Sequence, residues 1–232
     1  MHKALPTKRF AMCEYIVQHA AAHQMASLLV TGETANVDAP IGLAEDDTSG
    51  EAPPERRNLI KPGMRVHGIC RRDGTLDCLP VRWGWSPNWS MGTLPPLTHL
   101  PLHLVMRSRV FDRVKHNGRM LVAVEGWYEA LDTGMSIHSR NLAYTTAREP
   151  RPIFLAALAQ VSKTYNSCDG LALITHEDAE MKRQRLLAFT AQDALEWLRP
   201  DLEWAQAHLL AAYRAVLEPQ LEHVLTSQRG LR

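Results

Sequence analysis

The chain has 232 residues and a mass of 26.1 kDa, which is enough for one sizeable α+β domain or two very small ones. Its 45% hydrophobic and 22% charged residues exclude disorder throughout the chain. No apolar run approaches the roughly 20 residues of a membrane span, and no signal-peptide pattern follows the N-terminus. The net charge of +1 is unevenly distributed: residues 31–55 carry seven acidic residues and no Lys or Arg, which leaves +8 on the rest of the chain. Such a cationic body suits the binding of phosphates, although a solvated surface with one acidic loop explains the same charges.

The first part of the chain predicts three elements. Residues 13–30 are rich in Ala, Leu, Met and Gln, with apolar residues at helical intervals, which predicts a helix or a strand running into one. The acidic stretch 31–55 contains Pro and Gly, which favours a long surface loop. Within residues 64–82, the Asp73-Gly74 pair is the strongest hairpin signal in the chain.

The rest of the chain alternates apolar runs with amphipathic segments. Buried strands are predicted for residues 121–130, 151–161 and 170–176. Amphipathic helices are predicted for residues 191–198 and 201–217. Strands among loops, with helices at both ends, indicate one compact, β-rich α+β domain.

Cys13 is the first candidate for chemistry. The four cysteines of the chain are too few and too scattered for a disulfide framework and fit a reducing cytoplasm; they are Cys13, Cys70, Cys78 and Cys168. A thiol acts as a nucleophile through its thiolate, and a free amine on the same residue would supply a second nucleophile. A single cysteine also fits a small buried hydrophobe.

Three tryptophans stand close together in the segment WGWSPNW (83–89). Indoles on an irregular loop can serve as stacking platforms for unpaired bases, whereas buried indoles fill a core under a loop. Trp83 and Trp85 fit either role. Trp89, beside Pro87 and Asn88, is the better candidate for an exposed position.

Two glutamates, Glu125 and Glu129, lie four residues apart in the apolar run 121–130. In a continuous strand they would share one face. A carboxylate in an apolar strand tends to have a raised pKa and can then act as a general acid or base. The alternative is that both lie at a strand end in water.

Cations form a further group, which could follow a phosphate backbone or simply cover a solvated helix face. It comprises Arg107, Arg109, Arg113, Lys115, Arg119, Lys182, Arg183 and Arg185. The pair His99 and His103 has a metal-like spacing, but Pro101 lies between them and no carboxylate or cysteine is near in sequence. No metal site is therefore predicted.

In this order, these pieces resemble the SRAP family, the SOS-response-associated peptidase proteins that cross-link to abasic sites in single-stranded DNA. The resemblance covers roughly residues 12–200. Its pieces are Met12-Cys13, RNLIKPG (57–63), WGWSPNW (83–89), PPL (95–97), SRVF (108–111), NGRMLVAVEGWYEA (117–130), LALITHEDAE (171–180) and LEWL (195–198).

The resemblance implies a role for several residues. The family's N-terminal cysteine corresponds to Cys13, which twelve residues precede here, and its catalytic glutamate corresponds to Glu129. Its active-site asparagine falls on His99, which we include among the catalytic candidates, and its histidine falls on Lys182; His176 is the nearest histidine in sequence. Three further positions differ from the family: Glu14 replaces a Gly, and Tyr15 and Pro101 each replace an Arg. The residues implied to bind DNA are Trp89, Thr175, Arg57, Asn58, Lys182 and Arg185.

The resemblance further implies a single SRAP-type domain over residues 1–232, barrel-like and with peripheral helices. We expect an N-terminal extension at 1–12, the acidic loop at 31–55 and a C-terminal helical extension at 201–232. The expected protein is a cytoplasmic monomer without cofactors, associated with the nucleoid when it holds single-stranded DNA with abasic sites.

The reaction implied by the resemblance needs both nucleophiles of one residue. An amine condenses with the aldehyde of the opened sugar, and the adjacent thiolate closes a thiazolidine. Two other classes of function remain open: a binding module that has kept the fold without the chemistry, and a cysteine hydrolase that pairs Cys13 with a histidine such as His99.

Overall fold

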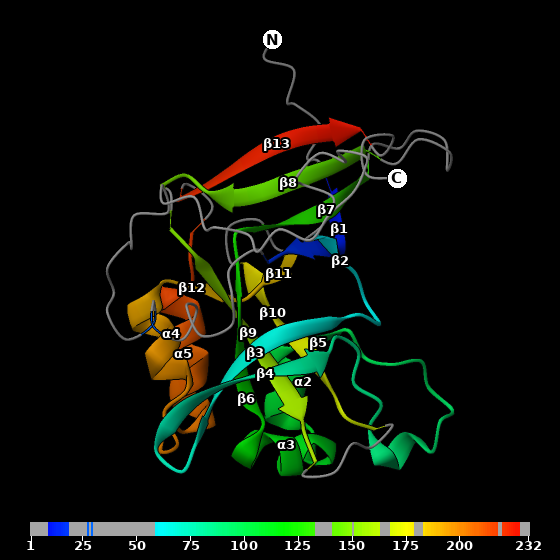
Figure 1. Ribbon diagram of the computed structural model, residues 1–232, viewed down its shortest axis with the longest axis vertical. Helices are drawn as coiled ribbons and strands as arrows, with labels where there is room; N and C mark the ends of the chain where they lie inside the picture. Colours follow the sequence, from blue (N-terminus) through cyan, green and yellow to red (C-terminus); the bar gives the residue numbers. More distant parts are fainter. Residues whose placement is uncertain are drawn as a thin grey trace, which may run out of the picture.

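The computed structural model describes residues 9–18, 27, 29, 59–132, 141–149, 151–162, 168–178, 183–217 and 220–227 (Figure 1). The chain folds into two β-sheets with short helices beside the larger one. The predicted acidic loop at 31–55 and the site candidates Arg57, Asn58 and Lys182 lie outside the described residues.

The smaller sheet has five strands in the order β13–β8–β7–β1–β2, and each pair of neighbours is antiparallel. Its strands are β1 (Arg9–Val17), β2 (Leu59–Ile60), β7 (Gly126–Asp132), β8 (Asn141–Ala147) and β13 (Leu221–Ser227). Strand β1 therefore has a partner on both sides, which fixes its position in the sheet.

The larger sheet has eight strands, with β11–β10–β9–β6–β3–β4 as its path; β12 pairs with β9, and β5 runs parallel to β10. Its strands are β3 (Arg65–Arg72), β4 (Thr75–Arg82), β5 (His99–Pro101), β6 (Arg119–Val124), β9 (Ile153–Gln160), β10 (Gly170–Asp178), β11 (Arg183–Leu186) and β12 (Ala188–Phe189).

The helices are short. They are η2 (Asn88–Ser90), α2 (Leu102–Arg107), η3 (Arg109–Phe111), α3 (Asp112–Asn117), α4 (Ala191–Trp197) and α5 (Trp204–Arg214). Helices α4 and α5 confirm the amphipathic segments predicted after residue 190. Among the described residues, no helix is long and apolar enough to cross a membrane.

The sheets are open, so the predicted barrel-like closure is wrong, whereas the β-rich α+β class is confirmed. Closure requires the first and last strands of a sheet to pair with each other. Among the described strands, β13 and β2 remain at opposite edges of the smaller sheet, and β11 and β4 at opposite ends of the larger path. Alternation of apolar residues does not reveal this difference, because inward and outward positions alternate in both architectures.

The Asp73-Gly74 hairpin is confirmed. Strands β3 and β4 pair in register from Arg65↔Arg82 to Arg72↔Thr75. Both central residues of the turn have positive φ, 47° at Asp73 and 83° at Gly74, as a two-residue type I′ turn requires.

The apolar run 121–130 is not one strand, because the chain passes from the larger sheet to the smaller one within it. Strand β6 ends at Val124 and β7 begins at Gly126. Glu125, between them, is exposed, whereas Glu129 is buried, so the expected common face is wrong. A Cβ at Gly126 would lie 2.5 Å from the carbonyl oxygen of Thr145, which explains why glycine occupies this corner.

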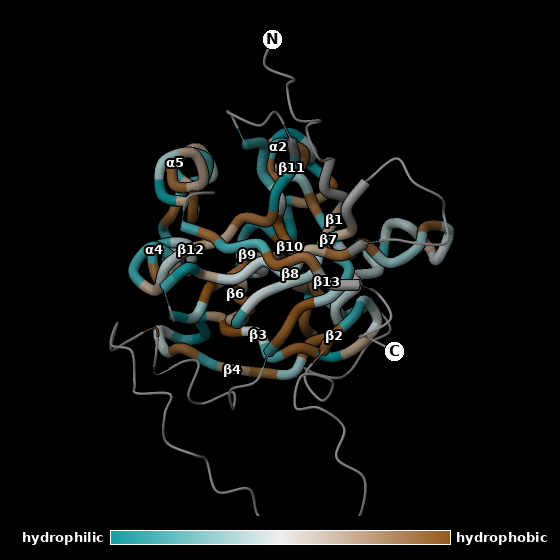
Figure 2. Tube along the Cα trace, turned by 90° about the horizontal axis from the view of Figure 1, so that it is seen from above, coloured by the Kyte–Doolittle hydropathy of each residue, from teal (hydrophilic) through white to brown (hydrophobic). Residues whose placement is uncertain are grey.

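Strand β9 confirms the predicted run 151–161 and separates the two halves of the core. Phe154, Ala156 and Leu158 belong to a cluster with Trp197 of α4, while the intervening residues belong to a cluster with Cys13 and Trp127. In Figure 2, α4 and α5 lie on one side of β9 and the smaller sheet on the other. A strand buried on both faces reads as a continuous apolar run, as observed. Strand β10 likewise confirms the prediction for 170–176.

The two ends of the chain differ from the expected extensions. Strand β1 begins at Arg9, so the end of the segment 1–12 already belongs to the smaller sheet, and residues 27 and 29 beyond it are helical. Residues 201–232 contain α5 but also β13, which pairs with β8 over seven residues. The expectation of a purely helical C-terminal segment is therefore wrong, because the backbone hydrogen bonds offered by β8 stabilise an extended chain there.

Candidate functional site

An open groove of about 750 Å³ brings together two of the catalytic candidates, Cys13 and His99. Its walls come from β1, from the turn after β2, and from the segment that leads into β5. The lining residues are Met12, Cys13, Glu14, Tyr15, Lys61, Pro62, Pro95, Pro96, Leu97, Thr98 and His99. Strands of both sheets thus contribute to one concave surface.

Cys13 and Glu129 lie opposite each other on neighbouring strands, since their Cα atoms are partners in the β1–β7 register. The register shifts on both sides of Cys13, between it and Phe10 and between it and Tyr15. Such irregularities re-aim side chains and often accompany functional sites. The pairing places a thiol and a carboxyl group side by side.

The thiol of Cys13 is protected. Its side chain is 4% exposed, and Sγ–H donates a hydrogen bond to the carbonyl oxygen of Tyr15 at 3.3 Å. Burial raises the pKa of Cys13 well above its ordinary value, and the nearby Glu129 carboxylate raises it further. The cysteine is therefore a neutral thiol at physiological pH, which is the less nucleophilic form.

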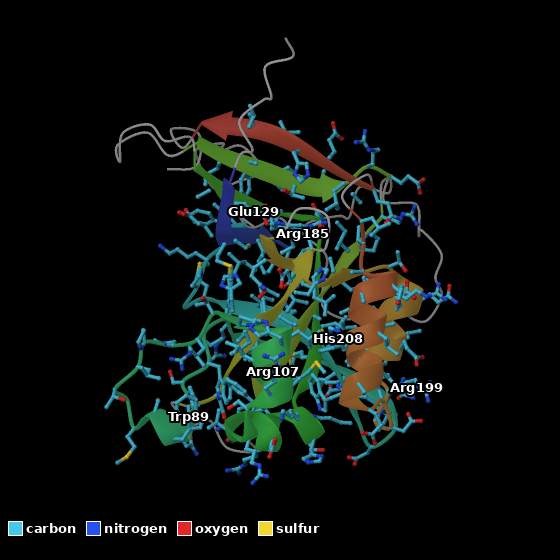
Figure 3. The ribbon with its side chains drawn as sticks, turned by 180° about the vertical axis from the view of Figure 1, so that it is seen from behind. Trp89, Arg107, Glu129, Arg185, Arg199 and His208 are labelled. Carbon is cyan, nitrogen blue, oxygen red and sulfur yellow. The ribbon has the colours of Figure 1, made fainter. Side chains whose placement is uncertain are left out.

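Glu129 is held from its own strand. It is 8% exposed, and one of its oxygens, Oε1, accepts a hydrogen bond from Nε1–H of buried Trp127 at 2.9 Å. Residues two apart on a strand share a face, so the indole and the carboxyl group point the same way. Figure 3 shows Glu129 in the smaller sheet, at the strand pair of β1 and β7.

His99 lies at the start of β5. Its Nδ1 is 3.0 Å from the hydroxyl oxygen of Thr98, and its ring meets the ring of Trp83 edge-on at 5.8 Å. Burial lowers the pKa of His99 to about 4, so the imidazole is neutral at physiological pH. Among the described residues, nothing forms a hydrogen bond with its buried Nε2.

Thr175 connects to a residue that the sequence did not single out. It is buried on β10, and its hydroxyl donates to Oε1 of Gln184 on β11 at 2.9 Å. Gln184 lies two residues after Lys182, the position of the family's histidine according to the resemblance. Only the folded structure reveals this contact, because the sequence does not predict that Gln184 on β11 faces Thr175 on β10.

Arg185 is engaged within the fold. Its Nη1 is 2.7 Å from Oδ2 of Asp178, and both side chains are largely buried. His176 is the register partner of Arg185, and burial, followed by this arginine's charge, lowers the pKa of His176 to about 4. To hold a phosphate, Arg185 would have to share or leave the Asp178 carboxylate.

The predicted cationic group divides into two kinds. Arg119 lies over Trp197 and Trp204, at 5.6 and 4.6 Å from the ring centroids, and donates to the carbonyl oxygens of Arg199 and Leu202. Its charge therefore joins β6 to α4 and α5. Lys115 forms an ion pair with Asp112 at 2.8 Å. Exposed cations remain on α2, η3 and α3, and these are Arg107, Arg109 and Arg113.

The predicted exposure of Trp89 is confirmed, and the structure decides between the two roles left open for Trp83 and Trp85. Trp83 and Trp85 are buried, whereas Trp89 on η2 is 46% exposed. Met91 and Leu94, which follow it, are exposed as well. Figure 3 shows Trp89 and Arg107 in the lower part of the molecule, on the side where α2 and α3 lie. This loop offers an exposed apolar ring.

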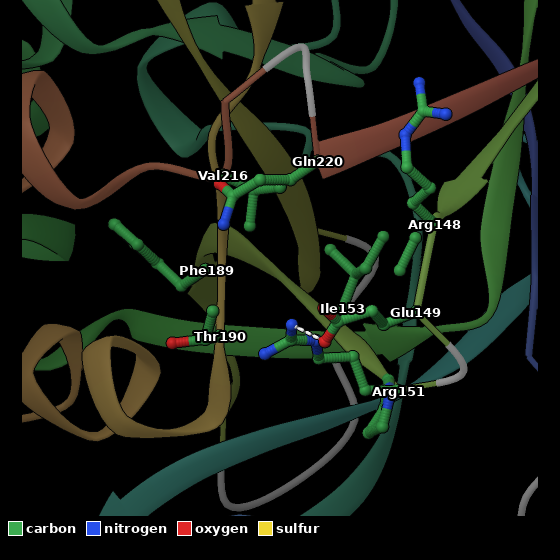
Figure 4. A pocket seen from close by; sticks show the side chains of 10 residues that line it. Arg148, Glu149, Arg151, Ile153, Phe189, Thr190, Val216 and Gln220 are labelled. Atoms are coloured by element: carbon green, nitrogen blue, oxygen red, sulfur yellow. Dashed lines mark hydrogen bonds and ion pairs between the residues drawn. The ribbon is translucent and has the colours of Figure 1, made fainter.

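A second, smaller pocket of about 170 Å³ contains none of the predicted site residues (Figure 4). It lies between the end of β8, the start of β9 and the segment before β13, and an ion pair joins Arg151 and Glu149 at its rim. In the part of the chain that the structure describes, no group of three or more His, Cys, Asp or Glu side chains could hold a metal ion.

Comparisons with known proteins support the family and the fold. The chain is 26% identical over 178 residues to the abasic site processing protein YedK of Escherichia coli (strain K12). This alignment covers 73% of this chain and 78% of the relative. Two solved structures share the fold: a phage-related protein from Bordetella bronchiseptica, with a TM-score of 0.69 and 20% identity over 92% of this chain and 94% of that one, and a protein from Bacteroides thetaiotaomicron, with a TM-score of 0.68 and 15% identity over 93% of each. Residues 12–228 match the family described as SOS response associated peptidase (SRAP), so the chain belongs to the SRAP family.

Proposed function

We propose that this protein processes abasic sites in single-stranded DNA by covalent capture at Cys13. The observation that carries the proposal is the direct pairing of Cys13 with Glu129 beside an open groove. The name of the Escherichia coli relative, an abasic site processing protein, points to the same substrate.

The reaction uses both nucleophiles of Cys13. Its α-amine condenses with the aldehyde of the opened sugar and releases water. The thiolate then adds to the imine carbon while the nitrogen takes up a proton, and a five-membered thiazolidine results. The second attack is intramolecular, which makes it fast and the product long-lived. Glu129 lies where a carboxyl group can transfer the protons of dehydration and addition.

This chemistry requires Cys13 to be the first residue. The fold tolerates that change, because in the described part of β1 only two register pairs with β7 precede Cys13, Arg9↔Asp132 and Phe10↔Leu131. The residues after Cys13 keep their pairs with β7, and Ile16 and Val17 also pair with β2. Removal of residues 1–12 therefore exposes an amine at the groove and leaves β1 held on both sides.

The exposed indole and arginines suit single-stranded DNA as the substrate. Trp89 presents an indole on which an unpaired base can stack, and the arginines of α2, η3 and α3 can contact phosphates. The groove at Cys13 is open, so an extrahelical sugar can enter it without displacement of a helix. The resemblance alone supplies further candidates for DNA contacts, which are Thr175, Arg57, Asn58, Lys182 and Arg185.

The test compares two forms of the protein on an oligonucleotide with one abasic site. A form that begins at Cys13 should give a heat-stable adduct on a denaturing gel without any reducing agent, and Cys13→Ala in that form should not. Cys168→Ala, at a half-buried cysteine outside the groove, is the matched control and should react normally. A heat-stable adduct that persists in the Cys13→Ala protein would refute the mechanism.

A second function, DNA binding without covalent capture, is favoured by one observation. The Cys13 thiol is buried and its pKa is raised, and the strand continues on its N-terminal side. If neither form of the protein gives an adduct but Trp89→Ala still weakens binding to single-stranded DNA, the protein is a binding module.

A further inference from the structure

Lys61 lines the same groove as Cys13. The sequence analysis assigned no role to this lysine. It follows Ile60, which is the register partner of Ile16 on β1, and its exposed side chain lines the groove together with Cys13, Glu14 and His99. Two different nucleophilic side chains, an amine and a thiol, thus share one concave surface.

The backbone around Lys61 is fixed. The amide of Gly63 donates to the carbonyl oxygen of Trp83 at 2.7 Å, and the amide of Met64 donates back to the carbonyl oxygen of Lys61 at 3.0 Å. Gly63 has a φ of 94°, which suits this turn. The turn is therefore attached both to β1, through β2, and to the buried Trp83, so the position of Lys61 at the rim of the groove is set by the sheets.

The side chain itself is available. Within the described part of the chain, no ion pair or side-chain hydrogen bond engages Lys61. The other described lysine, Lys115, bonds to Asp112 and to the carbonyl oxygen of Met106 and lies outside the groove. Primary amines react with aldehydes, whereas the nitrogen of Cys13 in the 232-residue chain is an amide and cannot.

We propose that Lys61 is an amine nucleophile that captures aldehydes in this groove as an imine, before or without exposure of the Cys13 amine. The nitrogen of Lys61 attacks the carbonyl carbon, a carbinolamine forms, and loss of one water molecule leaves a C=N bond. The inference rests on the proposed function for the identity of the aldehyde, the opened sugar of an abasic site. The imine is reversible, unlike the thiazolidine, so it becomes permanent only when a hydride reagent reduces it to a secondary amine.

The experiment uses the full 232-residue chain, with its intact mass verified, and an oligonucleotide that contains one abasic site. Sodium cyanoborohydride is added, and the trapped complex is measured on a denaturing gel. Lys61→Arg keeps the positive charge and removes the reactive amine; we expect it to lower the trapped yield by at least about tenfold. Lys115→Arg is the matched control and should trap like the parent. Peptide mapping should place the reduced adduct on Lys61.

Two results would overturn the inference: a trapped yield for Lys61→Arg within twofold of the parent, or an adduct mapped to another residue. Glycolaldehyde, used in place of DNA, separates this inference from the proposed function. If both probes label Lys61 while the form that begins at Cys13 gives no reductant-independent adduct, the inference holds and the thiazolidine chemistry fails. If the Cys13-first form cross-links while neither probe labels Lys61, the inference fails and the proposed function stands.

Discussion

Replacement of Glu129 by Gln asks whether this carboxyl group moves protons. Glu129 accepts a hydrogen bond from Trp127 at 2.9 Å, and the amide oxygen of Gln can accept the same bond. Gln is also nearly the same size, so the buried strand pair should keep its packing. What Glu129→Gln removes is a group that can exchange a proton.

The expected loss follows from the surroundings of Glu129. General acid–base catalysis is worth about 10²–10⁴-fold in rate, or about 2.7–5.5 kcal/mol of barrier. Glu129 is only 8% exposed, so water replaces it poorly, and His99, with a pKa of about 4, is not a proton donor at neutral pH. We therefore expect adduct formation by the Cys13-first form to slow by about a hundredfold or more, with DNA affinity unchanged.

One effect of the same substitution opposes this loss. The Glu129 carboxylate contributes, after burial, to the raised pKa of Cys13, so its removal favours the thiolate. A fall of one unit in a thiol pKa increases the thiolate fraction by at most about tenfold, which is less than the expected loss. Slower adduct formation should therefore prevail at neutral pH.

Single-turnover cross-linking rates, measured across pH, provide the assay. Glu125→Gln is the matched control, because Glu125 is exposed at the corner between β6 and β7. It should leave the rate unchanged. A Glu129→Gln rate within twofold of the parent would show that Glu129 is a structural residue and would favour the binding module.

Two further predictions concern DNA binding and acid stability. Trp89→Ala removes an exposed indole and should weaken the affinity for single-stranded DNA by about 1–3 kcal/mol, with the folding stability nearly unchanged. Fluorescence anisotropy measures the affinity, and equal affinities of the two proteins would remove Trp89 from the interface. The pKa of His99 is about 4 in the folded protein, whereas an ordinary histidine has a pKa of 6.5. Between these two pH values the unfolded chain therefore binds more protons than the folded one. The free energy of unfolding should fall as the pH drops from about 6.5 to 4. Urea titrations at pH 7 and 4.5 should show that His99→Asn removes about 2–3 kcal/mol of this fall, and equal falls in both proteins would contradict the assignment.

The elements that depend on neighbouring residues were predictable from the sequence. Asp73-Gly74 marks its turn because both residues must adopt positive φ, and few residue pairs do so readily. The β9 run is continuous in apolar residues because both of its faces are buried. The exposure of Trp89 follows from its flanking Pro87 and Asn88, which interrupt regular structure.

Features that depend on distant contacts were not predictable. The passage between sheets at Glu125 interrupts an apolar run without a turn signal, so a single strand was the simpler interpretation. Strand β13 needs the edge of β8 to form, and the sequence does not show that the edge is available. The apolar run singled out both Glu125 and Glu129, and only the family resemblance chose Glu129 as the catalytic one. Nothing in the sequence predicts that Lys61 lies near Cys13, since 47 residues separate them.

The use of Arg119 to hold α4 and α5 has a consequence for how this protein responds to ionic strength. An excess of eight positive charges would suggest many released counterions, but a cation bound to carbonyl oxygens and indole rings releases none when DNA arrives. The three exposed arginines of α2, η3 and α3 contribute a slope of only about −2 to a plot of log affinity against log salt on single strands. If these arginines are the main phosphate contacts of the proposed complex, the affinity that remains at physiological salt comes from stacking on Trp89 and from contacts in the groove.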